Sequence, residues 1–267
     1  MFSKLFSRKK VDKKKTSSKP HHSSAGSSKD RDAKSMRKGE IGEYKINIQL
    51  DQMPKEYKHL SDLLIKNPKS KSGYTQIDHV LITEYGIFVI ETKNYQGTVY
   101  GDRDKKTWSV NGKFTMLNPF IQNYGHLQAL TRIIGEKYEH CMISIVSFTK
   151  RCTFMIGTDL RDIKSNQLIV YDIELSEFIN RKIHVQKLLH HQPLLSAEEV
   201  SRIYTDIKKQ HIADSDALNH HVDVLKAQTK PRASCVVCNQ EVSERVKTFC
   251  LSNREFDGKV YCYTHQK

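Results

Sequence analysis

Two apolar runs at 76–82 and 87–93 carry two carboxylates and a lysine at a spacing that suits metal chemistry. The four residues between the runs predict a tight turn, so the runs should pair as an antiparallel hairpin. Counting outward from the turn places Asp78 opposite Glu91, with Lys93 beside them on the same face. Carboxylates about 5 Å apart at Cβ repel each other. A divalent cation such as Mg²⁺ would compensate this repulsion, and Lys93 would orient a water molecule or stabilise the charge of a phosphate.

The same pattern also fits a solvated sheet face, on which Asp78 and Glu91 would pair with neighbouring lysine or arginine side chains. Each carboxylate, however, borders an apolar run, at 80–82 or 87–90, which favours a hairpin that is central and at least half buried. Spacing alone leaves the two interpretations evenly balanced, because a strand register inferred from sequence is uncertain by a residue or more.

A second constellation of metal-binding residue types lies near the C-terminus. Two chelating pairs, Cys-x-x-Cys and Cys-x-x-His, are separated by 23 residues. This arrangement is typical of a tetrahedral Cys₃His zinc site. The predicted ligands are Cys235, Cys238, Cys262 and His265. A module spanning 234–267 is too small to fold on a hydrophobic core alone, so we predict a structural Zn²⁺ ion in it.

The role of this module stays open between a zinc staple, for stability or protein contact, and nucleic-acid binding through its aromatic residues. Cys250 has no partner at chelating spacing, so we interpret it as a packed or free thiol that would replace His265 only if that ligand failed. Cys141 and Cys152 lie outside the module and should be reduced and buried. This cysteine usage, together with the lack of a recognisable secretory signal, predicts a cytoplasmic protein.

The order of the predicted elements indicates an α/β fold. Asn118 and Pro119 supply an N-cap and a first helical residue, so a helix should follow. Residues 51–66 form a second amphipathic stretch after an opening helix, and 212–233 lose apolar periodicity and are interpreted as a linker. We expect helices at 40–50, 119–138, 172–180 and 196–211, strands at 76–82, 87–93, 97–101, 142–148 and 167–171, and an Asn-Gly turn within a ribbon at 108–114.

The net charge of +14 belongs almost entirely to the N-terminal part of the chain. Residues 1–39 carry +10 and the remainder only +4, so the charge says little about a nucleic-acid groove on the folded part. Residues 1–38 have too little apolar content to fold and should form a disordered basic tail. Phe2, Leu5 and Phe6 beside the basic cluster would allow a weak contact with an anionic membrane surface, but a solvated basic tail is the favoured interpretation. No apolar run is long enough to span a bilayer.

Several separated motifs occur in an order that resembles a known family. They are Lys38-Gly39-x-x-Gly42-Glu43, Gln76-Ile77-Asp78-His79-Val80, the run 86–94, Trp108, and Asn118-Pro119-x-x-Gln122-Asn123-x-x-His126. Together they resemble the nuclease-related domain, known as NERD, over about residues 37–150. The resemblance implies a restriction-endonuclease-like core of the PD-(D/E)xK superfamily, in which a central mixed sheet is flanked by helices, here extending over 39–211.

The resemblance also implies roles for individual residues. Asp78, Glu91 and Lys93 would occupy the D…(D/E)xK positions, Glu43 would be the helix carboxylate that joins a Mg²⁺ or Mn²⁺ site, and Gln122 would be the helical glutamine of the superfamily. His126 follows Gln122 by four residues on the same helix face, where it would contact phosphate or simply pack.

The leading hypothesis is a metal-dependent nuclease or nuclease-like protein that processes DNA by hydrolysing phosphodiester bonds. The alternative is a non-catalytic scaffold that keeps the nuclease fold and binds nucleic acid or protein. No nucleotide-binding glycine loop is present in the sequence, which disfavours a kinase or NTPase.

Overall fold

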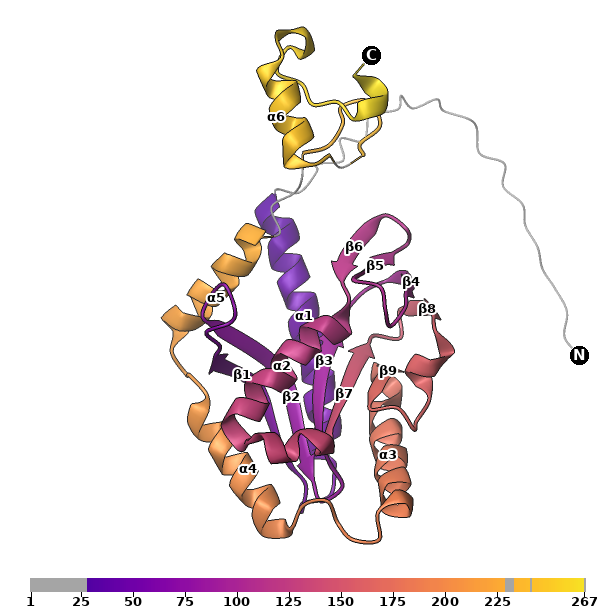
Figure 1. Ribbon diagram of the computed structural model, residues 1–267, viewed down its shortest axis with the longest axis vertical. Coiled ribbons are helices and arrows are strands. Elements are labelled where there is room, and N and C mark those ends of the chain that lie inside the picture. Colours follow the sequence, from indigo (N-terminus) through magenta and orange to yellow (C-terminus); the bar gives the residue numbers. More distant parts are fainter. Residues whose placement is uncertain (1–27, 229–232, 241, 267) are drawn as a thin grey trace, which may run out of the picture. The chain divides into compact units, whose positions relative to one another are not determined.

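The structure is a computed structural model that describes residues 28–228, 233–240 and 242–266. Its main part is a five-stranded sheet with the order β1-β2-β3-β7-β9 (Figure 1). The strands are β1 (Lys58–Lys66), β2 (Tyr74–Thr83), β3 (Gly86–Lys93), β7 (Met142–Phe148) and β9 (Gln167–Tyr171). β1, β2 and β3 are antiparallel neighbours, whereas β3, β7 and β9 run parallel, so the mixed sheet that the sequence predicted is confirmed.

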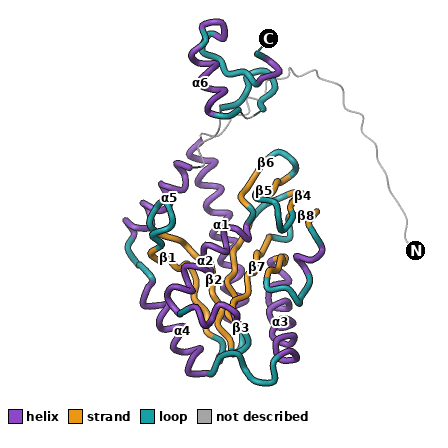
Figure 2. The backbone as a smooth tube through the Cα atoms, in the orientation of Figure 1, coloured by secondary structure: helices purple, strands orange, loops and turns teal. Residues whose placement is uncertain are grey.

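Helices cover both faces of this sheet, as Figure 2 shows. On one face, Leu130 of α2 (Pro119–Ile134) and Ile203 of α4 (Ala197–Gln210) pack on the sheet residues Val80 and Val89. On the other face, residues of α1 (Ser28–Asp51) and α3 (Leu175–Leu189) pack on the alternate strand positions. The contributing helix residues are Ile46, Leu50, Leu175, Phe178, Ile179 and Ile183.

A smaller four-stranded sheet has the order β6-β5-β4-β8. Its strands are β4 (Gly97–Gly101), β5 (Thr107–Val110), β6 (Phe114–Leu117) and β8 (Cys152–Ile156). Trp108 packs there against Phe120, and Val99 and Phe148 belong to the same cluster. The predicted Asn-Gly turn joins β5 to β6 within a three-residue loop, with positive φ at both Asn111 and Gly112, as a type I′ turn requires.

Two of the predicted boundaries differ from the structure at the start of the fold. Residues 28–38, which the prediction assigned to the disordered tail, form the first part of α1, because extending a packed helix is far easier than nucleating one. The remainder of that predicted tail, including Phe2, Leu5 and Phe6, lies outside the described residues. The stretch at 51–66 ends in strand β1 rather than a helix.

The predicted linker at 212–233 is a third difference, because residues 215–228 form helix α5 (Ser215–Gln228). Ala217 and His221, four residues apart, are the side chains that it buries, and Ser72 Oγ lies 2.7 Å from His221 Nδ1. Alanine and histidine give almost no apolar periodicity, which explains why the sequence pattern suggested a linker. Just before α5, His211 Nδ1 accepts from the main-chain N–H of Leu64 and covers the edge of β1.

No helix among the described residues is both long enough and apolar enough to cross a membrane.

Replacement of Ser72 by alanine should loosen α5. The substitution removes the partner of buried His221, and an unsatisfied buried polar group costs about 1–3 kcal/mol. Hydrogen exchange followed by mass spectrometry should therefore quicken in residues 215–228 and stay unchanged in α3. The exposed Ser201→Ala serves as the matched control. Unchanged exchange in α5 would show that other contacts hold it.

Candidate active site and metal-binding module

The predicted site residues on β3 and α2 meet around the carboxylate of Glu91, which is only 3% exposed. Lys93 Nζ donates to Glu91 Oε1 at 2.6 Å and to Gln122 Oε1 at 2.9 Å. Gln122 Nε2 donates to the same Glu91 oxygen at 2.7 Å. These three side chains therefore form a closed, charge-assisted hydrogen-bond triangle.

Helix α2 is held in place to complete this triangle. Asn118 Oδ1 accepts from the main-chain N–H of Phe120, and this cap fixes where the helix begins. One turn later, buried Asn123 donates to the carbonyl oxygen of Val89 at 3.0 Å and to Ser144 Oγ at 2.7 Å. The helix is thus tied directly to β3 and β7 beside Gln122.

His126 completes the surroundings of Glu91. Its Nε2 lies 3.1 Å from Glu91 Oε2, and its Nδ1 lies 2.9 Å from Thr75 Oγ1. An ionised carboxylate only accepts hydrogen bonds, so Nε2 carries the proton that points to Glu91. The sequence left His126 between packing and phosphate contact, and the structure shows it buried and bonded to Glu91.

Asp78 lies at the end of the ladder between β2 and β3. The ladder follows the predicted register through Val80–Val89 and ends at His79–Ile90, one pair before the expected Asp78–Glu91 pair. Asp78 Oδ2 instead accepts from Thr92, from the main-chain N at 2.7 Å and from Oγ1 at 2.6 Å.

The carboxylates of the site have opposite electrostatic environments. Burial raises the pKa of Asp78 well above its usual value, and the charges of Glu91 and Glu43 raise it further. Burial would also raise the pKa of Glu91, but Lys93 and His126 lower it to about 2. Burial likewise opposes the charge of Lys93, yet Glu91 raises the pKa of the lysine. Glu91 and Lys93 are therefore both charged, whereas Asp78 lacks a cationic partner.

Glu43 on α1 belongs to the same electrostatic group. Its pKa is raised by burial and then by the charges of Asp62, Glu91 and Glu40, while Lys93 opposes the shift. The sequence analysis missed Asp62, which lies in β1 with a left-handed φ of 51° and accepts from Gln76 Nε2 at 2.7 Å. Asp62 directly precedes the apolar run 63–65, and this signal was missed because no strand was predicted in 51–66.

The residues present fit a hard divalent cation by their chemistry. Glu43, Asp78 and Glu91 offer carboxylate oxygens as ligands. The charge of Glu91 raises the pKa of Glu43, and the charges of Glu91 and Glu43 raise the pKa of Asp78. A cation would relieve this repulsion. Their ligand atoms are more widely spaced than those of a preformed cage. In the described part of the chain, the one group with all such atoms within 4.8 Å of one another lies in the C-terminal module.

Comparison with known proteins agrees with this geometry. Residues 38–149 match the family described as the nuclease-related domain, NERD. An uncharacterized protein of Bacillus anthracis is 32% identical over 193 residues, which are 70% of this chain and 84% of that protein. The chain belongs to the NERD family. No solved structure matches it.

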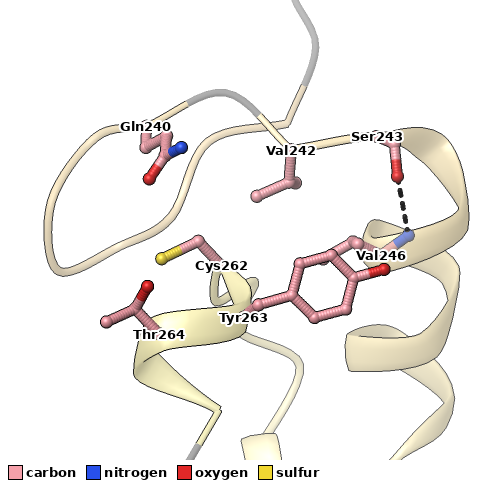
Figure 3. A pocket seen from close by; sticks show the side chains of 7 residues that line it. All are labelled: Gln240, Val242, Ser243, Val246, Cys262, Tyr263 and Thr264. Atoms are coloured by element: carbon pink, nitrogen blue, oxygen red, sulfur yellow. Dashed lines mark hydrogen bonds between the residues drawn. The ribbon is translucent and has the colours of Figure 1, made fainter.

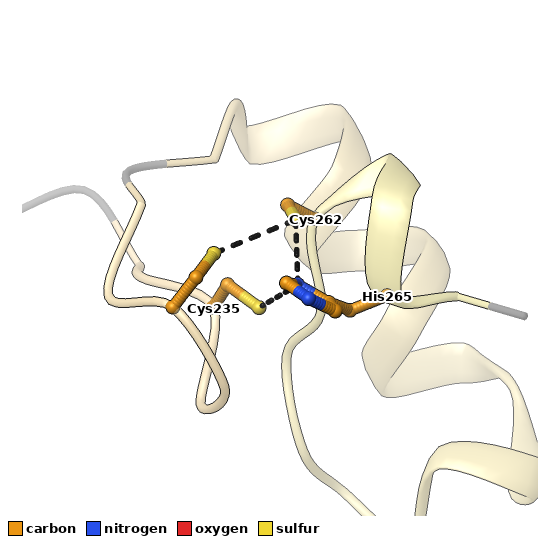
Figure 4. Close-up of side chains that lie close together, drawn as sticks. Cys235, Cys262 and His265 are labelled. Atoms are coloured by element: carbon orange, nitrogen blue, oxygen red, sulfur yellow. Dashed lines mark hydrogen bonds between the residues drawn. The ribbon is translucent and has the colours of Figure 1, made fainter.

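The Cys/His module of this NERD protein lies outside the family match. Figure 4 shows Cys235, Cys262 and His265 pointing toward one another. Cys262 Sγ lies 3.2 Å from His265 Nδ1, and the Sγ atoms of Cys238 and Cys262 lie 3.7 Å apart. A tetrahedral zinc ion with Zn–S bonds of about 2.3 Å needs an S–S spacing of about 3.8 Å. The four predicted ligands therefore form a group that could hold such a metal ion.

Cys250 is buried but stands apart from that group. Its Sγ lies 3.3 Å from the carbonyl oxygen of Tyr261 and 3.3 Å from Gln266 Nε2, which fits the predicted packed thiol. A pocket of about 350 Å³ opens between α6 (Glu244–Ser252) and the second chelating pair, with Tyr263 at its edge (Figure 3).

We predict opposite stability changes for two carboxylate replacements in the NERD domain without metal. Asp78→Asn should stabilise the fold at pH 7 by on the order of 1 kcal/mol, because it removes a charge that burial disfavours. Glu91→Gln should destabilise it by about 3 kcal/mol, because Lys93 loses its buried partner. Urea unfolding in chelator measures both, with the exposed Asp104→Asn as control.

The pH dependence of these changes gives a second readout. Because the folded-state pKa of Asp78 is raised, its protonated form favours folding, and the gain from Asp78→Asn should shrink as the pH falls through that pKa. The folded-state pKa of Glu91 is lowered from 4.5 to about 2, so the loss from Glu91→Gln should shrink as the pH falls between these values. A stabilising Glu91→Gln at pH 7 would contradict the ion-pair account.

For the C-terminal module, Cys262→Ser should abolish stoichiometric zinc and unfold residues 234–267, whereas Cys250→Ser should retain the metal. Metal quantification and tryptic sensitivity of the module give the two readouts. Zinc loss in Cys250→Ser but not in Cys262→Ser would reassign the ligand.

Proposed function

We propose that this NERD protein is a Mg²⁺- or Mn²⁺-dependent nuclease that hydrolyses phosphodiester bonds, with DNA as its substrate. The observation that supports this most directly is the charged Lys93, held by Glu91 and Gln122 beside the acidic group of Asp78 and Glu43. A cation site next to a fixed ammonium group is what attack on a phosphate diester needs.

In this proposal Glu43, Asp78 and Glu91 hold the cation. Such a cation, when bound, lowers the pKa of a water molecule and neutralises charge that develops on the phosphate. Lys93 stays protonated, and its one N–H that is not bonded to Glu91 or Gln122 positions the attacking water or a phosphate oxygen. Gln122 keeps the ammonium group in place, and His126 fixes the rotation of the Glu91 carboxylate from its other oxygen.

The second candidate is a non-catalytic scaffold with the same fold, and one observation favours it. Glu91 already has its Oε1 bonded to Lys93 and Gln122 and its Oε2 to His126, so its charge is compensated without a cation. A protein that binds nucleic acid or a protein partner without cleavage would keep such a network for stability. Under either proposal, the C-terminal module carries a structural Zn²⁺ ion.

The deciding experiment is incubation of the full chain with supercoiled, linear and single-stranded DNA in Mg²⁺, Mn²⁺ or chelator. Cleavage should require the cation, and Lys93→Ala should lower the rate by about 10² to 10³ because one electrostatic group is removed. The exposed Lys55→Ala should cleave at the wild-type rate. Intact DNA in every metal, combined with unchanged Mg²⁺ affinity in Asp78→Asn, would support the scaffold.

A further inference from the structure

A continuous series of aromatic contacts runs between the two sheets next to the candidate active site. The ring centroids of Phe114 and Tyr95 are 5.7 Å apart, and those of Tyr95 and Phe148 are 6.4 Å apart. The series continues to Phe154 at 5.4 Å and on to Tyr171, which is stacked at 4.2 Å. Its middle is buried core, so the outer ring rests on a rigid support.

Phe114 is the exposed end of this series. Its side chain is 53% exposed on the edge strand β6, whereas Phe148 is fully buried. The hairpin that carries Phe114 is fixed at its turn, because Asn111 Oδ1 accepts from the main-chain N–H of Thr98 at 2.8 Å and Asn111 N donates to Thr98 O at 2.7 Å. These bonds hold the turn next to Phe114, and the ring packs on one side against Tyr95 while it stays half exposed.

Tyr95 connects this ring to the site. It follows Lys93 by two residues. Burial raises the pKa of Tyr95, the charge of Lys93 opposes this shift, and the charge of Glu91 adds to it. The phenol therefore lies within electrostatic range of both charged groups. Phe114 is one ring contact away from Tyr95, which follows Lys93 by two residues in the chain.

Two exposed cationic side chains lie close in the chain to the ring or to its neighbour Tyr95. Lys113 is exposed and precedes Phe114 at the start of the strand. Arg151, also exposed, bonds through Nη2 to Asn94 Oδ1, between Lys93 and Tyr95 in the chain. Proteins bind single-stranded nucleic acid by stacking its bases on exposed aromatic rings and neutralising its phosphates with nearby cationic side chains.

We propose that Phe114 is a stacking platform for an unpaired base of single-stranded DNA that is bound at the candidate active site. The inference rests on the proposed function and names its substrate form. Bases within a duplex are already stacked on one another, so a single exposed ring gains little from them. Loss of one such platform typically weakens single-strand binding by about 10-fold.

The test uses binding in chelator, where no cleavage occurs, to compare a single-stranded oligonucleotide with a duplex of the same sequence. Phe114→Leu keeps an apolar side chain but loses the flat ring, so it should bind the single strand about 10-fold more weakly and the duplex as wild type does. Phe114→Trp should keep single-strand affinity, and its indole fluorescence should be quenched on binding. Trp108 is 1% exposed, so the wild-type emission should change little.

Leu117→Ala is the matched control, because Leu117 is exposed on the same strand but lies outside the aromatic series. Wild-type affinity in Phe114→Leu, an equal loss toward duplex, an unquenched Phe114→Trp or no single-strand binding by wild type would each overturn the platform. Failure of the proposed nuclease activity shows up separately. A wild type that never cleaves in Mg²⁺ but loses single-strand affinity through Phe114→Leu would refute catalysis and support the platform.

Discussion

The ion pair between Lys93 and Glu91 at the end of β3 is the interaction on which the site depends. Both side chains are largely buried, and burying a charge costs free energy unless hydrogen bonds satisfy its remaining donor protons and acceptor lone pairs. Gln122 and His126 supply those bonds from one face of α2, four residues apart. The helix must therefore lie against β3 in one rotation and one translation. Two hydrogen bonds to the main chain fix the same position of the helix: Asn118 accepts from the N–H of Phe120, and Asn123 donates to the carbonyl oxygen of Val89.

Asp78 shows what the same burial does without a cationic partner. Its bonds come from the main chain and hydroxyl of Thr92, which are neutral donors, so burial and the repulsion from Glu91 and Glu43 are only partly offset. The two carboxylates of this hairpin, Asp78 on β2 and Glu91 on β3, therefore differ in how their charges are compensated. The charge of Glu91 is compensated, whereas the charge of Asp78 is disfavoured by burial and by its acidic neighbours, and groups with perturbed pKa values of this kind are typical of binding sites.

Sequence reasoning located the hairpin, α2 and the chelating pairs because each rests on local rules: strand alternation, an Asn-Pro helix start and ligand spacing. It missed what depends on tertiary contact. The buried face of α5 is formed by Ala217 and His221, which no hydrophobicity pattern detects. Asp62 joins the acidic group only because β1 pairs with β2. The bond from His126 to Glu91 depends on how α2 lies on the sheet, and spacing along the helix does not determine it.

The chain order explains how the smaller sheet belongs to the site. Lys93 is the last residue of β3, and Gln122 is the fourth residue of α2. The hydrogen bond between them joins the two ends of the intervening chain segment, which contains β4, β5 and β6. This segment, which includes Phe114, therefore begins and ends at the site. A change in the length or side chains of residues 94–117 can therefore alter the surroundings of the site without moving the residues that would bind the cation. The core sheet fixes the positions of the candidate site residues, and under the proposed function the segment 94–117 would determine which form of nucleic acid reaches them.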